Sequence, residues 1–317
     1  MNNREKGIGL VLIATLFWGI MGISSRILYN AGLSAIFIAF SRSFLSAVCF
    51  LIWVFIKDRE VLKTDIKGLV VAAFYGIGTF ALCFVGYNLS VEYIPISVAT
   101  VLMFTNSIWV TIFGVLFFSE KFNMKKGFVI VLTLGGCIMV SNMSLGHLSM
   151  SGIGIAAGLG TGFLFAFQII FPKLFSSYRK DTLLVYGYIF ASVFLGFFTN
   201  FNESFSIIKN SPNIGMVILN LLSIGILSTF ISNTFYIKST EYIEASVTSI
   251  LASLEPVLAS IFAFIIFGEV MNSKQILGAV LIVVAAILLE LNVDKERFLN
   301  SNILKIFGFK NSKIINE

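Results

Sequence analysis

Ten long apolar runs dominate the sequence and constrain its fold more than any other feature. An α-helix needs about 20 residues to cross a hydrocarbon core of roughly 30 Å, and the runs are of this order. Only 12% of the residues are charged and 57% are hydrophobic, which excludes a soluble domain because so few charges cannot cover so much apolar surface. The runs cover residues 7–29, 34–56, 68–89, 96–118, 125–141, 152–171, 183–200, 213–236, 244–267 and 273–291.

The connections between the runs are short, and the longest cover residues 57–67, 142–151 and 201–212. None is long enough to fold as a soluble domain. Backbone polar groups in lipid must bond internally, so the runs are predicted to be helices, and the alternating strands of a β-barrel are absent. The first run is too long for the core of a signal peptide and is interpreted as a retained span. The sequence therefore predicts an all-α integral membrane protein with ten transmembrane helices.

Lysine and arginine are distributed very unequally over the two sides of this arrangement. With the N-terminus inside, 18 of the 22 basic residues lie on inner connections or in the tail, whereas Lys209 and Lys274 lie outside. Arg26 and Arg42 fall within spans. Because cytoplasmic loops are enriched in lysine and arginine, both termini are predicted to be cytoplasmic. The net charge of +6 reflects this bias, and no nucleic-acid partner is expected.

The chain repeats itself at an offset of 149 residues. Residues 87–98 and 236–247 are identical at seven of twelve positions, and the same offset aligns Glu120 with Glu269. Each repeat holds five spans, and since five is odd, the second copy enters the membrane from the opposite side. Inverted repeats are typical of secondary transporters, which bind substrate near the midplane and alternate between two states. The predicted domains are a first repeat, 1–141, an inverted second repeat, 142–291, and a cytoplasmic amphipathic tail, 292–317.

Several short motifs resemble those of a known family. They are Phe17-Trp18-Gly19 and Arg42 in the first half, and Ser246-Val247, Leu254-Glu255-Pro256-Val257 and Gly268-Glu269 in the second. On these elements, residues 8–291 resemble the EamA-type transporters of the drug/metabolite transporter (DMT) superfamily. The resemblance implies a ten-span carrier with two EamA repeats and does not specify the substrate. The fourth span departs from the family pattern, because Asn106-Ser107 stand where a proline is usual.

Glu255 and Arg42 are the two charges placed deep enough in spans to require an explanation. Glu255 lies near mid-bilayer, where a carboxylate costs several kcal/mol unless it is paired, hydrated or protonated. Pro256 is expected to break the helix there, and broken helices expose backbone to substrate or ion. Glu255 would couple protons or bind a cationic group, or else fix a neighbouring helix. Arg42 would bind a substrate carboxylate or pair with Glu255, or else snorkel or form a fixed bridge.

Other polar and aromatic residues at membrane depth are further candidates. Three amides would line a wet cavity or bond between helices. Four large rings would form an aromatic-walled cavity, or else pack against lipid and core. The predicted substrate-binding set comprises Trp18, Arg42, Tyr75, Asn106, Trp109, Gln168, Asn233, Tyr236 and Glu255. Glu120 and Glu269, at span ends, are interpreted as helix caps or anchors.

The sequence contains no recognisable enzyme or cofactor motif. It has one histidine, His147, and its three cysteines lack metal-ligand spacing, so no catalytic residue, metal or cofactor is expected. A channel is the weaker alternative because no short pore helix accompanies Val85-Gly86-Tyr87. The sequence predicts a secondary carrier that exports an amino acid or another small metabolite, with protons as a candidate coupling ion. Alternative solutes are a cationic drug, a nucleotide precursor or a sugar. A short chain without targeting extensions fits a bacterial plasma membrane.

Overall fold

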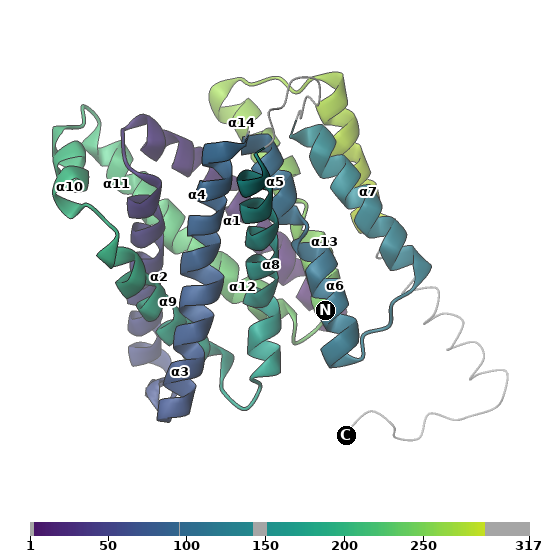
Figure 1. Cartoon of the computed structure of the whole chain (residues 1–317), viewed down its shortest axis with the longest axis horizontal. Helices are drawn as coiled ribbons and strands as arrows, with labels where there is room; N and C mark the ends of the chain where they lie inside the picture. The colour runs from purple at the N-terminus through teal and green to yellow at the C-terminus, as the bar shows by residue number, and fades with distance from the viewer. Residues whose placement is uncertain (1–2, 95, 142–150, 289–317) are drawn as a thin grey trace.

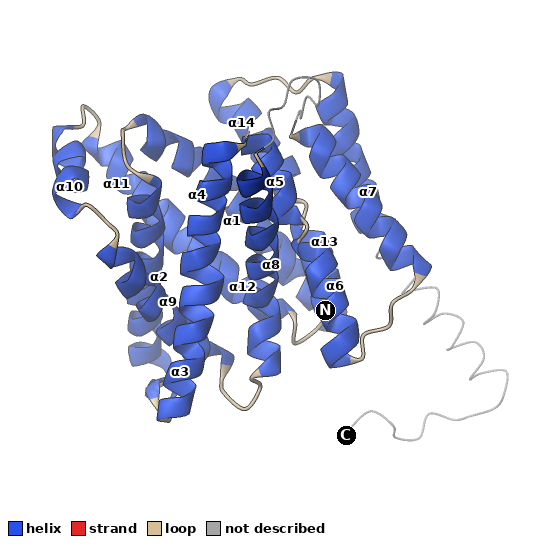
Figure 2. Ribbon diagram, in the orientation of Figure 1, coloured by secondary structure: helices blue, strands red, loops and turns tan. Residues whose placement is uncertain are grey.

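The computed structural model describes residues 3–94, 96–141 and 151–288, and the regular structure in these ranges is helical (Figures 1 and 2). Eight of the described helices are long and apolar enough to cross a membrane, and each coincides with a predicted span. The prediction of an all-helical, multi-pass membrane protein is confirmed. The predicted tail, 292–317, and His147 lie outside the described residues. The eight helices are Asn3–Asn30, Ala35–Lys57, Ile66–Ser90, Val98–Phe118, Gly152–Leu174, Lys180–Phe197, Ile214–Ser239 and Ala245–Phe267.

Four of these spans are continuous α-helices and four change geometry part-way. The continuous ones are α1 (Asn3–Asn30), α2 (Ala35–Lys57), α8 (Gly152–Leu174) and α9 (Lys180–Phe197). Two others contain a π-helical segment, in the orders α3 (Ile66–Tyr75), η2 (Gly76–Leu82), α4 (Cys83–Tyr93) and α11 (Ile214–Leu222), η4 (Ser223–Ile231), α12 (Ser232–Ser239). The last two are broken, into α5 (Ile96–Phe104) and α6 (Asn106–Phe118), and into α13 (Ala245–Ala252) and α14 (Glu255–Phe267).

Shorter helices complete the described structure. The short 3₁₀ helix η1 (Arg59–Leu62) follows α2, α7 (Met124–Val140) follows α6, and a final helix covers Ser273–Leu288. The predicted connection 201–212 is largely a helix, α10 (Phe201–Asn210), which was not anticipated from the sequence. Asn200 caps it by accepting from the backbone amide of Glu203, and the Asn200 side-chain amide donates to the Glu203 carboxylate. Its ten residues are too few to cross a membrane.

The interruptions of the spans recur at the sequence offset of 149 residues. Thr105 and Leu254, which this offset aligns, stand at the two breaks and have nearly the same backbone conformation, φ −62°, ψ −8° and φ −70°, ψ −13°. Each amide bonds the carbonyl three residues back, at 3.2 Å and 3.1 Å. The broken spans both end in a left-handed residue, Ser119 with φ 53° and Gly268 with φ 69°. Local geometry therefore follows the sequence repeat.

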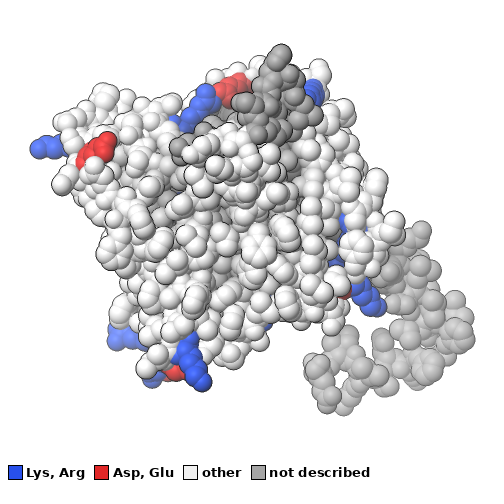
Figure 3. Space-filling model, in the orientation of Figure 1, with Lys and Arg blue, Asp and Glu red and all other residues white. Residues whose placement is uncertain are grey.

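The helices run between two ends of the molecule. We call the end with connections 58–65, 119–123, 175–179 and 240–244 the basic end, and the other, with 31–34, 198–213 and 268–272, the far end. Charged atoms gather near the upper and lower edges in Figure 3, and the surface between them is largely uncharged. Apolar side chains such as Phe74 and Phe197 are 72% and 83% exposed, which suits contact with lipid rather than water.

Helices of one half pack mainly against helices of the other. Helix α1 lies against α12 and α14, and α8 lies against α4, α5 and α6. The π segments also contact the opposite half, η4 against α2 and η2 against α9. At Gly76 a Cβ atom would lie 2.0 Å from the carbonyl oxygen of Gly187, so this glycine permits the approach of η2 to α9. The core between the halves contains the candidate site.

Candidate substrate site

Arg42 lies within α2 and is buried, with 9% of its surface exposed. Its Nε donates to Oγ1 of Thr229 in η4 at 3.1 Å, and its Cζ lies 4.0 Å from the centre of the Phe84 ring in α4. The Thr229 hydroxyl donates its own hydrogen to the carbonyl of Ile224 at 2.6 Å, so it is oriented to accept from Arg42. The terminal nitrogens Nη1 and Nη2 have no hydrogen-bond partner among the described residues. Thr229 and Phe84 thus hold the guanidinium in place, and its two terminal nitrogens are not engaged by a described residue.

Glu255 is the first residue of α14, directly after the break. Pro256 occupies the first turn, where its missing N–H leaves no hydrogen bond unmade, so the predicted break at this proline is confirmed. The helix dipole favours negative charge at this end of a helix. The side chain is partly exposed and makes no hydrogen bond or ion pair with a described residue. Arg42 and Glu255 lie within electrostatic range of each other without forming an ion pair.

Asn106 stands at the equivalent point of the other broken span, since the offset of 149 residues aligns it with Glu255. It is 1% exposed, and its Oδ1 lies 3.4 Å from the Ser107 hydroxyl, which also lies 3.4 Å from the carbonyl oxygen of Ser249. This contact joins α6 to α13. The fourth span therefore breaks without the proline that is usual there, and it carries a neutral amide where the ninth span carries an acid.

Trp18 and Tyr236 meet in the centre of the molecule. Their rings lie 4.9 Å apart at 61°, an edge-to-face contact, and the Phe165 ring lies 6.0 Å from Trp18 and 6.5 Å from Tyr236. The three rings come from α1, α12 and α8. Tyr236 is also within electrostatic range of Glu255. The Trp18 helix α1 also packs against α14, whose first residue is Glu255.

Two buried polar atoms beside this cluster have no partner among the described residues, Oη of Tyr236 and Oδ1 of Asn233. The amide nitrogen of Asn233 donates to the Tyr188 hydroxyl at 2.7 Å. A buried polar atom left unpaired costs about 1–3 kcal/mol. Asn233 and Tyr236 are three residues apart on α12, so they share a face. The Tyr236 hydroxyl and the Asn233 carbonyl oxygen are therefore available to hydrogen-bond a polar solute or water.

Two predicted site residues have polar groups that already bond within the protein, and a third packs against a partly exposed ring. The Tyr75 hydroxyl donates to the carbonyl of Gln168 at 2.9 Å, and the Gln168 amide donates to the carbonyl of Thr79 in η2 at 3.0 Å. Both side chains therefore join α8 to the third span. Trp109 packs edge-on against Phe163 at 5.3 Å, and Phe163 is 37% exposed. These residues line the periphery of the candidate site.

Sequence reasoning missed the residues that orient Arg42. Thr229 and Phe84 lie within apolar runs and carry no charge or motif that distinguishes them from core residues. Tyr188, which bonds Asn233 and stacks on Phe80 at 4.2 Å, is equally inconspicuous. To find these residues from the sequence, one would have to know which helices pack against α2. Those helices are far apart in the sequence, and only the fold shows that they are neighbours.

At the basic end, Glu120 is 8% exposed and caps the first turn of α13. It accepts from the amides of Ala245 and Ser246 at 3.0 Å and 3.4 Å and from the Ser246 hydroxyl at 2.5 Å. Two lysines surround it, Lys173 at 3.5 Å and Lys126 at 3.9 Å, and Lys126 also pairs with Glu244. We call Glu120, Lys126, Lys173, Glu244 and Ser246 the Glu120 cluster. The interpretation of Glu120 as a helix cap is confirmed.

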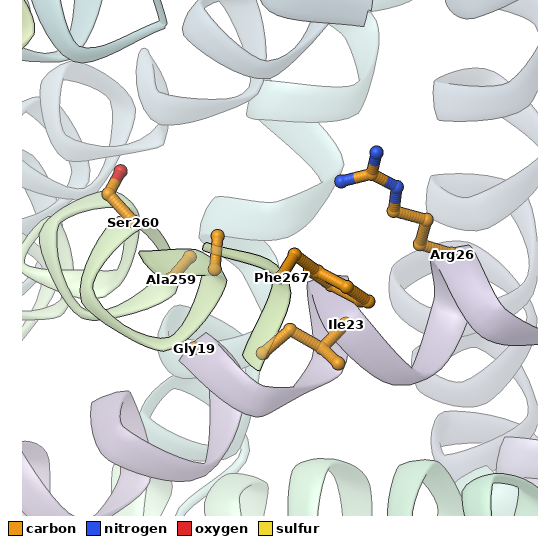
Figure 4. A pocket seen from close by; sticks show the side chains of 8 residues that line it. Gly19, Ile23, Arg26, Ala259, Ser260 and Phe267 are labelled. Carbon is orange, nitrogen blue, oxygen red and sulfur yellow. The ribbon is translucent and has the colours of Figure 1, made fainter. Parts of the chain in front are cut away.

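At the far end, Glu269 pairs with Arg26 at 2.5 Å, and both side chains are about half exposed. A cavity of about 240 Å³ adjoins this pair between α1 and α14. Figure 4 shows its wall, with Gly19, Ile23 and Arg26 on α1 and Ala259, Ser260 and Phe267 on α14. We call Arg26 and Glu269 the Glu269 pair. It is more exposed than the Glu120 cluster and has fewer hydrogen bonds.

The geometry is that of a helical membrane protein with unpartnered polar groups between its halves. The model of the EamA-like transporter family matches residues 5–142 and again 152–291. The chain belongs to the EamA-like transporter family. Curated relatives of this EamA-like transporter are transporters and not enzymes.

The relatives match it along nearly their whole length. It is 24% identical over 292 residues to an uncharacterised transporter of Clostridium kluyveri, covering 90% of this chain and 93% of the relative. It is 24% identical over 306 residues to the uncharacterised inner membrane transporter YicL of Salmonella typhimurium, covering 92% and 97%. A solved crystal structure has a TM-score of 0.76 at 13% identity, covering 92% of this chain and 99% of the other, and supports the fold.

Proposed function

We propose that this transporter is a secondary carrier that exports a small organic metabolite, an amino acid or a close relative, from a bacterial cell by alternating access. The observation that carries the proposal is the pair of opposite charges at the junction of the two halves, Arg42 and Glu255, neither of which forms an ion pair with a described residue. Charges inside a membrane protein cost several kcal/mol when unpaired, so packing alone would not retain them. A solute with its own opposite charges would satisfy both.

The arrangement of each charge fits one end of an amino acid. Arg42 presents Nη1 and Nη2 as a fork, and a guanidinium fork binds a carboxylate with two parallel hydrogen bonds. Glu255 would accept the ammonium group or, in its absence, a proton. The open atoms of Asn233 and Tyr236 would bond the remaining polar groups, and Trp18 would pack against the side chain. We assign Tyr75, Asn106, Trp109 and Gln168 to the supporting wall.

The proposed architecture has ten spans in two inverted repeats. Helices α7 and Ser273–Leu288 would complete five spans in each of the units 1–141 and 142–291, and 292–317 would be the cytoplasmic tail. Support comes from the π segments, breaks and left-handed ends that recur at 149 residues, and from the basic residues concentrated at one end. Both termini would then be cytoplasmic, and the basic end would be the inner end.

Transport by purified protein in liposomes tests the proposal. Accumulation of radiolabelled solutes would be measured for a panel of amino acids, sugars, amines and nucleotide precursors, with and without a pH gradient. We expect accumulation of an amino acid, increased by the gradient, and loss of the gradient effect in Glu255→Gln. Gln has nearly the same size, so the variant changes the charge and not the packing.

Three results would contradict the proposal in separate ways. Accumulation of sugars or amines alone would overturn the substrate class. An unchanged pH effect in Glu255→Gln would overturn the role of Glu255 in proton coupling. Flux that does not saturate with solute concentration would indicate a channel instead of a carrier.

A further inference from the structure

The two ends of the molecule carry matching sets of side chains. At the basic end, Lys173 of α8 lies 4.6 Å over the Phe118 ring and pairs with Glu120. At the far end, Arg26 of α1 lies 4.9 Å over the Phe267 ring and pairs with Glu269. The offset of 149 residues aligns Phe118 with Phe267 and Glu120 with Glu269. Each broken span thus ends in a phenylalanine, a left-handed residue and a glutamate held by a cation from the other half.

The two sets differ in what else the glutamate binds. The Glu120 side chain is 5% exposed and bonds the first turn of α13, whereas the Glu269 side chain is 49% exposed and pairs with Arg26. Packing follows the same division. Every residue of α13 is buried and α6 packs against it, whereas in α14 Val257 is the buried residue. The broken spans are therefore closed against each other at the basic end and less closely packed at the far end.

The sequence identifies the turn at the far end that corresponds to the turn capped by Glu120. The same offset aligns Ala245-Ser246, the turn that Glu120 caps, with Ile96-Ser97 at the start of α5. The start of α5 and the end of α14 both lie at the far end. We propose that Glu120 and Glu269 are alternating helix caps, each of which closes one end of the carrier by binding the first turn of the opposite broken span. Glu269, still paired with Arg26, would bind the backbone amides at 96 and 97 when Glu120 releases α13.

Because the two caps are chemically alike, the two states are expected to have similar free energies. A carboxylate at a helix N-terminus gains charge-assisted hydrogen bonds and a favourable interaction with the helix dipole. Breaking one cap while the other forms loses and regains the same kind of bonds, so neither state is strongly favoured. The cations Lys173 and Arg26 would stay with their glutamates in both states and hold each carboxylate in position. The inference rests on the alternating-access part of the proposed function and not on the substrate.

Distances between spin labels test the proposal without any substrate. Labels would be attached to cysteines introduced at Lys121 and Glu241 for the basic end, and at Tyr93 and Val270 for the far end, in the full chain carrying Cys49→Ser. We expect Glu120→Gln to lengthen the basic-end distance and shorten the far-end distance, changing the ratio of the two populations about tenfold, the effect of losing one or two charge-assisted bonds. Glu269→Gln should deplete the far-end-closed population, and the double variant should return toward the wild-type ratio.

Two further variants separate this role from a general loss of stability. Ser246→Ala removes one hydroxyl from the Glu120 cluster and should shift the populations in the direction of Glu120→Gln by a smaller factor. Glu60→Gln removes an exposed carboxylate that pairs with Lys63 at the same end and should leave both distances unchanged. The proposal is overturned if Glu120→Gln and Glu269→Gln shift the distances in the same direction, or if neither Glu120→Gln nor Ser246→Ala shifts them. Failure to transport amino acids would leave these distances, and hence this test, unaffected.

Discussion

At the scale of single residues, the orientation of Arg42 depends on side chains from two other spans. Thr229 lies 187 positions away in sequence and belongs to a π-helical segment, in which a residue bonds the carbonyl five positions back. The depth of Arg42 and Glu255 could be predicted, because charges are rare in apolar runs. The partners of Arg42 could not, because neutral residues in such runs look alike until the helices are paired.

Thr229→Val should weaken solute binding without unfolding the protein. The substitution keeps the shape of the side chain and removes the oxygen that accepts from Arg42, so the fork is no longer held. We expect the KM for a carboxylate solute to rise about tenfold, which corresponds to about 1.4 kcal/mol. The measurement is concentration-dependent uptake into liposomes.

Thr234→Val is the matched control for this prediction. Thr234 donates to the carbonyl of Phe230 at 2.6 Å, as many helical threonines do, and it bonds no arginine in the described part of the chain. Its KM should remain near that of the wild type. Equal effects of the two substitutions would show that Thr229 acts through its helix and not through Arg42.

At the scale of elements, α8 approaches the break in the fourth span most closely at Gly162. A Cβ atom at Gly162 would lie 2.5 Å from Oγ1 of Thr105 and 2.7 Å from the carbonyl oxygen of Leu102. The four-residue spacing of glycines on α8 predicts a helix-packing face. It does not predict that this face meets the break at Thr105, because no proline marks that break.

Gly162→Ala should therefore destabilise the folded protein. The added methyl group would overlap backbone at the break, and such overpacking costs about 1–3 kcal/mol. Gly160, on the same helix, has open space around it, so Gly160→Ala should be neutral or stabilising by up to about 1 kcal/mol. Thermal unfolding in detergent, followed by intrinsic fluorescence, compares the two variants. A lower midpoint for Gly160→Ala than for Gly162→Ala would contradict this account of the packing.

At the scale of the whole molecule, apolar length and composition were sufficient to predict the eight described spans, and short motifs were sufficient to predict the family. Both properties are local in the sequence, so they can be recognised without knowing which helices pack together. The arrangement of the candidate site was predicted less completely. Trp18 and Tyr236 do lie together, whereas Trp109 packs against the half-exposed Phe163, because a ring within a span can face lipid as readily as the core.

The orientation of the whole molecule can be measured in intact cells. A cysteine at Lys209, in α10 at the far end, should react with a membrane-impermeant maleimide added outside. A cysteine at Lys121, at the basic end, should react after the cells are permeabilised and not before. The parent protein, with Cys83 and Cys137 buried, provides the background. Labelling of the Lys121 position in sealed cells would reverse the proposed orientation.

The pairing of Asn106 with Glu255 at equivalent breaks also has an electrical consequence. The backbone conformations at the two breaks are nearly the same, but only the ninth span carries an ionisable group there. An exchange of conformations between the halves would displace that charge along the membrane normal, with no charge at the equivalent break of the other half to offset it. Moving one elementary charge through a full potential of 100 mV is worth about 2.3 kcal/mol, so a fraction of this suffices to bias two nearly equal states. Membrane voltage would then act as a further control on the direction in which the carrier rests.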